Sequence, residues 1–221
     1  MQTPNRITFT KSNGIAVAEF GIIPIEPNMT GVILCGGQSS RMGTDKGLLT
    51  TATHTWAQAA AGKIAALGLP FYLSVNEAQY PDYAAHFLNS KLIRDNNTID
   101  VHGPLHGVLS AHIELPKEDL FILACDMPLM EIPVLQQLFN SSREHTADAF
   151  VFTNDGIYEP LCGIYSATGL SYIIQLLKNN HLPKHSMKYT LEHLSTYAIA
   201  LRPEQKQYFR NFNAHADLNG L

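Results

Sequence analysis

Two cations stand in one glycine-rich segment of this 221-residue chain, directly after a short apolar run at 32–34. Gly36 and Gly37 follow that run, and Arg41 and Lys46 come next. Adjacent glycines let the backbone approach a ligand closely and turn its amides toward phosphate oxygens. A forked guanidinium and a compact ammonium supply positive charge. This combination predicts a binding site for a polyphosphate.

The same segment lacks two common phosphate-binding fingerprints. Neither Gly-x-x-x-x-Gly-Lys-Ser/Thr nor Gly-x-Gly-x-x-Gly occurs in residues 31–49, so a Walker loop and a dinucleotide-binding loop are both excluded there. A glycine-rich segment by itself is also typical of a plain connection between a strand and a helix. The two cations favour the ligand-binding interpretation.

Polar side chains follow three further apolar runs. Asp126 and Asp95 each stand at the end of such a run, and Asn76 follows another. A carboxylate facing a cationic loop can hold Mg²⁺ on phosphates, which makes Asp126 the candidate metal ligand. The alternatives are a capping role for Asp126, a solvated loop position for Asp95 and a plain turn position for Asn76. As a binding residue, Asn76 would hydrogen-bond a base or a ribose.

After residue 30, strand and helix patterns alternate along the chain. The expected strands are 32–34, 71–75, 91–94, 120–124, 149–152, 161–165 and 197–201. The expected helices are 56–67, 107–115, 132–139, 170–177 and 187–194. This alternation indicates an α/β domain with a mainly parallel sheet covered on both faces. Ligands bind such sheets at the carboxyl ends of the strands, so the polar residues above should meet at one edge.

The first 29 residues form a separate N-terminal arm in this interpretation, and residues 30–221 form one domain. Alternating residues at 6–11 and 14–20, around Ser12-Asn13-Gly14, predict a β-hairpin. Prolines at 24 and 27 end that pattern. Three roles stay open for the arm: an edge hairpin, a contact between subunits, or a flexible lead. The sequence does not predict an oligomeric state.

Composition excludes several classes of protein. The formal charge of −4 argues against a general nucleic-acid or membrane-surface binder, which would carry a basic excess. No stretch reaches about 18 apolar residues and no apolar run follows a basic start, so we expect a cytoplasmic protein. An odd number of well-separated cysteines predicts neither a disulfide framework nor a zinc site, and favours a reducing compartment; they are Cys35, Cys125 and Cys162.

Three histidines lie close together around a Gly-Pro turn, at His102, His106 and His112. No carboxylate stands near them at the spacing of a metal site. We expect them to be polar loop and helix-surface residues.

Five ordered segments resemble the molybdenum-cofactor nucleotidyltransferases, and most of all the guanylyltransferase form of that family. CGGQSSRMGTDKGLL is similar to the family's signature loop. The segments that follow resemble its later motifs in the same order: IRDNNTIDVHGPLHGVLSA, FILACDMPLM, EPLCGIYS and FRNFNAHADL. Together they span residues 30 to about 218.

The resemblance implies a cytosolic, Mg²⁺-dependent enzyme with a Rossmann-like, three-layer nucleotidyltransferase fold. Such an enzyme joins GTP to Mo-molybdopterin, releases pyrophosphate and makes the guanine dinucleotide form of the cofactor. The resemblance also implies transient contacts with cofactor-insertion proteins and recipient enzymes, without nucleic acid or membrane partners.

The resemblance also assigns roles to individual positions. Backbone groups at 34–37 would line the nucleotide, and Asp95 would lie on the nucleotide side. Lys46 would meet the phosphates and Asp126 the metal, and we expect Arg41 to join them in offsetting charge on the α-phosphate and the leaving group. The backbone residues are Leu34, Cys35, Gly36 and Gly37. The family's asparagine after the second strand corresponds either to Ser74 or to Asn76.

Two other functions are alternatives to this interpretation. The first, and the more similar to it, is the cytidylyltransferase of the same cofactor pathway. The Gly36-Gly37 pair, the Asp45-Lys46 pair and Cys125 favour the guanylyl form. A non-catalytic nucleotide-sensing module with the same fold is the other. Sugar-nucleotide pyrophosphorylases share the fold but usually have longer chains.

Overall fold

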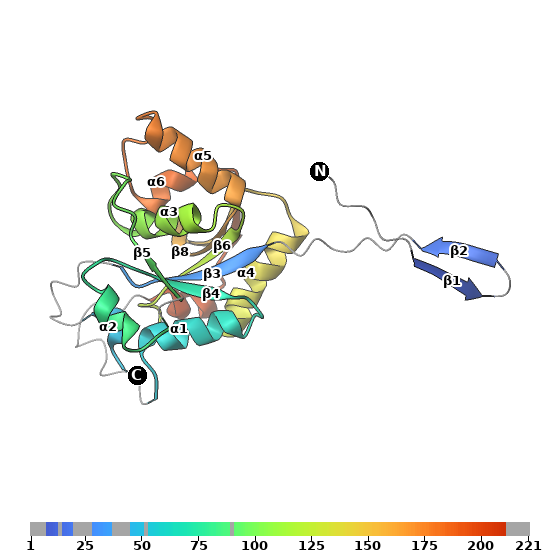
Figure 1. Cartoon of the computed structure of the whole chain (residues 1–221), viewed down its shortest axis with the longest axis horizontal. Helices are drawn as coiled ribbons and strands as arrows, with labels where there is room; N and C mark the ends of the chain where they lie inside the picture. Colours follow the sequence, from blue (N-terminus) through green and yellow to red (C-terminus); the bar gives the residue numbers. More distant parts are fainter. Residues whose placement is uncertain are drawn as a thin grey trace.

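The computed structural model describes residues 8–12, 15–19, 28–36, 45–50, 53–88 and 91–210. Within these ranges, seven strands form one sheet in the order β5-β4-β3-β6-β8-β7-β9. Helices cover both faces, with α1 and α4 on one side and α3, α5 and α6 on the other (Figure 1). The predicted three-layer α/β fold is confirmed.

The strands run mainly parallel, as predicted. Their bounds are β3 (Met29–Leu34), β4 (Phe71–Val75), β5 (Leu92–Arg94), β6 (Asp119–Ala124), β7 (Ala149–Asn154), β8 (Ile157–Tyr165) and β9 (Thr196–Ala200). Strand β8 is antiparallel to both of its neighbours, β6 and β7, whereas the other pairings are parallel. Asp155 and Gly156 have φ of 50° and 80°, the conformation of a tight two-residue hairpin turn, and they reverse the chain between β7 and β8.

The helices are α1 (Trp56–Ala65), α2 (Tyr80–Ala84), α3 (Pro104–Glu114), α4 (Ile132–Glu144), α5 (Ala167–Lys178) and α6 (Met187–Leu191). Two 3₁₀ helices, η1 (Lys46–Leu48) and η3 (Pro203–Phe209), complete the described elements. The five predicted helices are present. Helix α3 begins three residues earlier than expected because Pro104 suits the first turn of a helix. Helix α2, η1 and η3 were not predicted.

Both faces of the central strands are buried. In β3, Ile33 belongs to the apolar core under α1 and α4, whereas Val32 belongs to the core under α3 and α5. All six residues of β3 are buried. This two-sided burial explains why the strand has a continuous apolar sequence rather than an alternating one.

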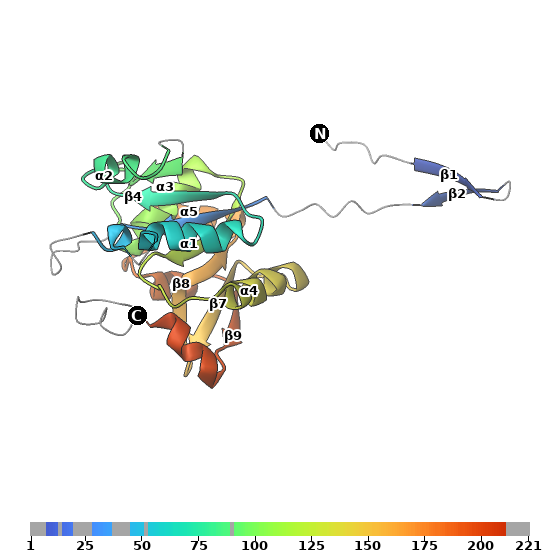
Figure 2. The same ribbon diagram turned by 90° about the horizontal axis from the view of Figure 1, so that it is seen from below.

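The N-terminal hairpin forms a two-stranded sheet of its own. Strand β1 (Thr8–Ser12) pairs antiparallel with β2 (Ile15–Glu19), as expected for a hairpin, with Ser12 opposite Ile15. Figure 2 shows these strands apart from the seven-stranded sheet. None of the helices in the described ranges is long and apolar enough to cross a membrane.

Candidate active site

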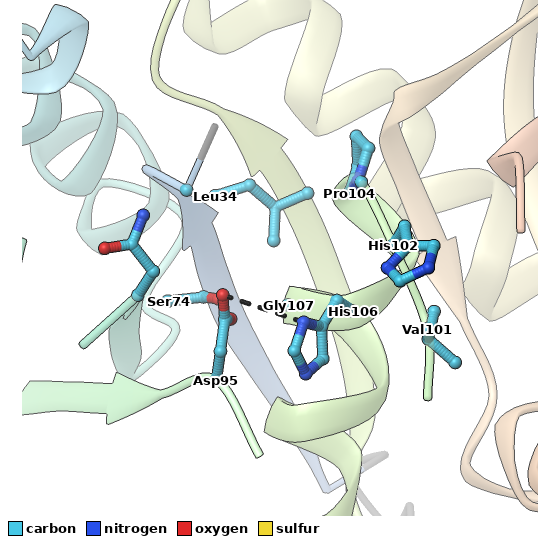
Figure 3. A pocket seen from close by; sticks show the side chains of 11 residues that line it. Leu34, Ser74, Asp95, Val101, His102, Pro104, His106 and Gly107 are labelled. Carbon is cyan, nitrogen blue, oxygen red and sulfur yellow. Dashed lines mark ion pairs between the residues drawn. The ribbon is translucent and has the colours of Figure 1, made fainter. Parts of the chain in front are cut away.

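The carboxyl ends of β3, β4 and β5 border a cavity of about 530 Å³. The first turn of α3 and the loop before it close the opposite side (Figure 3). Of the residues predicted from the sequence, the cavity is lined by Leu34, Gly36, Ser74, Asn76 and Asp95. The ends of the three strands therefore bring together residues that lie far apart in the chain, from Leu34 to Asp95. Gly37 and Arg41 lie outside the described residues.

The GPLHG sequence shapes the cavity wall. Gly103 has a φ of 68° and directly precedes Pro104, the first residue of α3. At Gly107, an added Cβ would lie 2.5 Å from the Ser74 hydroxyl oxygen and 3.3 Å from a Leu34 methyl carbon. Glycine at this position lets α3 pack directly against the ends of β3 and β4.

Lys46 and Asp126 form an ion pair at the ends of η1 and β6. The Lys46 Nζ lies 3.2 Å from Asp126 Oδ2, and each side chain is about one-fifth exposed. The described residues contain no group of three or more histidine, cysteine or acidic side chains able to hold a metal. A metal at Asp126 would therefore take most of its oxygen ligands from phosphates and water, which suits Mg²⁺.

Asp45 fixes the end of the glycine-rich segment. Its Oδ1 accepts hydrogen bonds from the Gly47 amide at 2.9 Å and the Tyr83 hydroxyl at 2.7 Å, and its Oδ2 accepts one from Gln79 Nε2. Gln79 Nε2 also donates to the Cys35 carbonyl at 3.0 Å. Helix α2 thus holds both ends of the segment that separates Cys35 from Asp45.

Tyr83 is a hydrogen-bond donor in this arrangement. Its side chain is fully buried, and burial together with the nearby Cys35 and Cys125 raises the pKa of Tyr83 far above its ordinary value. The phenol therefore stays protonated at any physiological pH. Gln79 and Tyr83 were not predicted from the sequence, because neither stands at a strand end or in a recognisable motif.

The backbone amide and carbonyl of Cys35 both form hydrogen bonds within the protein. Its amide donates to the Ser74 carbonyl at 3.0 Å, and its carbonyl is the acceptor for Gln79. Gly36, the next residue, is exposed at the cavity. Among the described residues of the predicted backbone contact, Gly36 is the exposed one, and Leu34 also lines the cavity.

Both candidates for the residue after the second strand line the cavity. Asn76 Oδ1 accepts from the Gln79 amide at 2.9 Å, and Gln79 Oε1 accepts from the Asn76 amide at 3.0 Å, so Asn76 also caps the turn into α2. The Ser74 hydroxyl is buried and has no hydrogen-bond partner among the described residues. The geometry is compatible with a ligand contact from either side chain.

Asp95 is not a solvated loop acid. Its side chain is 18% exposed, and Oδ2 lies 3.9 Å from Nδ1 of His106. Burial raises the pKa of Asp95, and the facing His106 acts in the opposite direction. His102 and His106 both line the cavity, which the expectation of ordinary polar histidines did not include.

His112 is a core residue, so the expected helix-surface position is wrong. It is 2% exposed, and its Nε2 lies 3.0 Å from the Ser171 hydroxyl oxygen, which joins α3 to α5. Its neighbours on the same helix face, Leu105 and Leu109, precede it by seven and three residues and are also buried. That helical spacing is the sequence signal that could have predicted its burial.

Burial of His112 predicts a pH dependence of stability. Desolvation lowers the pKa of His112 below its usual 6.5, so the unfolded chain binds a proton that the folded chain does not. We expect the free energy of unfolding to fall as the pH drops below about 6.5. His112→Gln should make this slope shallower by up to about one proton per molecule, measured by urea unfolding between pH 7 and 5. An unchanged slope would contradict the prediction.

Comparison with known proteins places the chain in a family. The model of the MobA-like NTP transferase domain matches residues 31–194. A probable molybdenum cofactor guanylyltransferase from Nostoc sp. is 32% identical over 86% of this chain and 89% of its own length. One from Flavobacterium johnsoniae is 28% identical over 87% and 96%.

A solved structure has the same fold. Molybdopterin-guanine dinucleotide biosynthesis protein A from Archaeoglobus fulgidus superimposes with a TM-score of 0.68, at 20% identity, over 87% of this chain and 96% of that one. The family match and the Nostoc relative together show that the chain belongs to the MobA-like NTP transferase family and is a nucleotidyltransferase.

Proposed function

We propose that this protein transfers GMP from GTP to Mo-molybdopterin and releases pyrophosphate, as a molybdenum cofactor guanylyltransferase. Relatives with that name match 84% to 88% of the chain at 26% to 32% identity. The observation that carries the proposal is the Lys46–Asp126 pair, which stands at the strand-end edge that also holds the Asp95 cavity. This arrangement supports binding of a nucleotide and its phosphates along one edge.

The reaction needs positioning and charge neutralisation more than a covalent catalyst. A phosphate oxygen of the pterin is already ionised and would attack the α-phosphorus of GTP in line with the departing pyrophosphate. Lys46 would turn from Asp126 to the phosphates, and Arg41 would add a second cation. These groups would offset the charge that grows on the α-phosphate and the leaving group.

Asp126 fits a divalent cation. It is a partly buried carboxylate whose oxygen lies 3.2 Å from a lysine nitrogen, so it already compensates a positive charge in the protein. Mg²⁺ bound there would neutralise phosphate charge and act as a Lewis acid. In the same proposal Leu34, Cys35, Gly36 and Gly37 line the nucleotide.

Three further expectations belong to the proposal. The N-terminal arm, expected at residues 1–29, is separate from the catalytic domain expected at 30–221, except that Met29 already belongs to β3. The protein works in the cytoplasm. Cofactor-insertion proteins and recipient enzymes contact it transiently.

The test is reconstitution with Mo-molybdopterin, Mg²⁺ and each of the four nucleoside triphosphates. We expect pyrophosphate release and dinucleotide formation with GTP above the other three. Preference for CTP would identify a cytidylyltransferase instead. Absence of pyrophosphate release with all four, by a protein that still binds nucleotide, would identify a non-catalytic module.

A further inference from the structure

His106 lies between a backbone carbonyl and an acidic side chain at the wall of the cavity. Its Nε2 is 2.9 Å from the Asn96 carbonyl oxygen, and its Nδ1 is 3.9 Å from Asp95 Oδ2. Figure 3 shows the imidazole and the carboxylate facing each other across the dashed line. Both side chains are about one-fifth exposed.

The carbonyl determines which ring nitrogen of His106 carries a proton. A carbonyl oxygen only accepts hydrogen bonds, so Nε2 must be the donor. A neutral ring would then present a bare lone pair at Nδ1 to the Asp95 carboxylate. The contact is attractive only when the pair holds one more proton, either on Nδ1 or on the carboxyl group. The protonation of Asp95 is therefore linked to the imidazole that faces it.

Neighbouring hydrogen bonds hold the two partners in place. The Asp95 amide donates to the Val75 carbonyl at 3.0 Å. The Asn96 amide donates to the Ser110 hydroxyl at 2.8 Å, and Asn96 Oδ1 accepts from the Thr98 amide at 2.8 Å. The loop that carries the carboxylate is thus attached to β4 and to α3. The imidazole and the carboxylate cannot easily move apart when their charges change.

The second oxygen of Asp95 is available to a ligand. Oδ1 is buried and has no hydrogen-bond partner among the described residues, and Asp95 lines the cavity. A buried carboxylate oxygen without a donor is costly, so this atom needs a donor from a bound molecule or from water. An ionised Asp95 would accept a hydrogen bond from such a donor at Oδ1. A carboxyl group protonated at that oxygen would itself be a donor there and could not accept in the same way.

Other charged groups near the pair are turned toward partners of their own. On β5, the Arg94 guanidinium lies 3.3 Å from Glu77 and stacks over Tyr80. In the loop before α3, His102 lies 3.8 Å from Asp100, and both are largely exposed. The facing positions on β4 are the neutral Ser74 and Asn76; further along α3, His112 contacts Ser171. Among the described residues, the ionisable side chain that faces Asp95 is therefore His106.

We propose that His106 is a positioning residue that keeps Asp95 ionised and oriented, so that Asp95 Oδ1 accepts a hydrogen-bond donor of the bound nucleotide. The inference rests on the proposed function for the identity of the ligand, but not for the coupling between the two side chains. The donor is an N–H of the base or a hydroxyl of the ribose. Loss of His106 removes the group that opposes the effect of burial on the pKa of Asp95, so Asp95 takes up a proton at a higher pH.

The experiment compares GTP binding by the whole protein, His106→Ala and His106→Gln across pH 5.5 to 8.5. Dissociation constants would come from calorimetry with Mg²⁺ present. We expect both variants to bind about tenfold more weakly at pH 6, because one unit of pKa change corresponds to a tenfold change in ionisation. The difference should shrink below about threefold at pH 8.5, where Asp95 is ionised in every variant. His86→Gln, which changes an exposed histidine outside the cavity, is the control and should match the unmodified protein.

A double-mutant cycle separates this role from a structural one. Asp95→Asn should weaken binding at every pH, and adding His106→Ala to it should cause little further loss. A loss at His106 that is equal at pH 6 and pH 8.5, or that persists in the Asp95→Asn background, would overturn the proposal. Inosine triphosphate and 2′-deoxy-GTP identify the donor: the base amine is implicated if the first loses the pH effect, and the ribose if the second does.

Carbon-13 NMR of the aspartate carboxyl groups tests the coupling without any nucleotide. The pKa of Asp95 should be higher in His106→Ala than in the unmodified protein, and an unchanged value would overturn the proposal. This result does not depend on which nucleotide the enzyme uses. A failed GMP-transfer assay together with a shifted Asp95 would therefore reject the proposed function and leave the inference standing.

Discussion

Asp126→Ala is expected to lower the rate of GMP transfer about a thousandfold while the protein remains folded. A metal ion contributes several kcal/mol of charge stabilisation in such reactions, and each ~1.4 kcal/mol is a factor of ten. The substitution also removes the 3.2 Å ion pair between Lys46 and Asp126. Because this ion pair is partly exposed to solvent, its loss should change the free energy of unfolding little.

The measurement is initial-rate kinetics over a range of Mg²⁺ concentrations. Asp126→Asn should retain more activity and need more Mg²⁺, because an amide oxygen is a weaker ligand than a carboxylate. Asp155→Asn is the matched control: this acid pairs with Lys206 in an exposed turn, and its loss should leave the rate unchanged. Near-normal GTP turnover by Asp126→Ala would refute the metal-binding role.

Gly47→Ala is expected to impair both stability and activity, because the side chain has no space. An added Cβ would lie 2.0 Å from the Tyr83 hydroxyl oxygen and 3.2 Å from the ring carbon that carries it. Tyr83 is fully buried and its hydroxyl is bonded to Asp45, so the ring cannot yield. We expect a loss of about 1–3 kcal/mol of unfolding free energy, as for other overpacked cores. Lys46 would shift with η1, and kcat/KM should fall about ten- to a hundredfold.

Two further variants test the cause of that loss. Tyr83→Phe removes the clashing oxygen, so Gly47→Ala combined with Tyr83→Phe should recover much of the stability that Gly47→Ala alone loses. Gly62→Ala is the control, since nothing lies within 4 Å of its added Cβ and alanine favours the interior of α1. If Gly47→Ala is as stable as Gly62→Ala, the packing argument is wrong.

The sheet could be predicted from the sequence because its central strands are buried on both faces. Such strands have short, continuous apolar sequences, as β3 and β6 do, and these are hard to mistake for surface segments. The direction of β8 was not predicted. Its signal was present in the Asp155-Gly156 pair between two apolar runs, which is typical of a tight hairpin. Helix α2 is only five residues long and contains Pro81, so no helical period could develop.

Candidate site residues could be predicted where a chemically suitable side chain follows the end of a strand. Asp95 follows β5 directly and Asp126 stands two residues after β6, so the strand-end rule predicts that both lie at the same edge of the sheet. The side chains that position the site were not predictable in this way. Tyr83 meets Asp45 across 38 residues, and Gln79 meets Cys35 across 44. Such pairings depend on the folded path of α2, which one sequence does not reveal.

The reversed strand β8 has a consequence for the shape of the enzyme. Leu123 of β6 pairs with Cys162, so the residues from Ile157 to Pro160 continue past the last paired residue of β6 with only β7 beside them. Strand β7 pairs on its other side with β9 as far as Thr153, so β8, β7 and β9 extend together past the paired part of β6. The turn between β7 and β8, at Asp155-Gly156, faces solvent, and the Asp155 carboxylate pairs with Lys206. Solvent-facing turns accept insertions at low cost in free energy, so we expect a longer β7–β8 turn to leave the strand ends beside Asp95 and Asp126 in place.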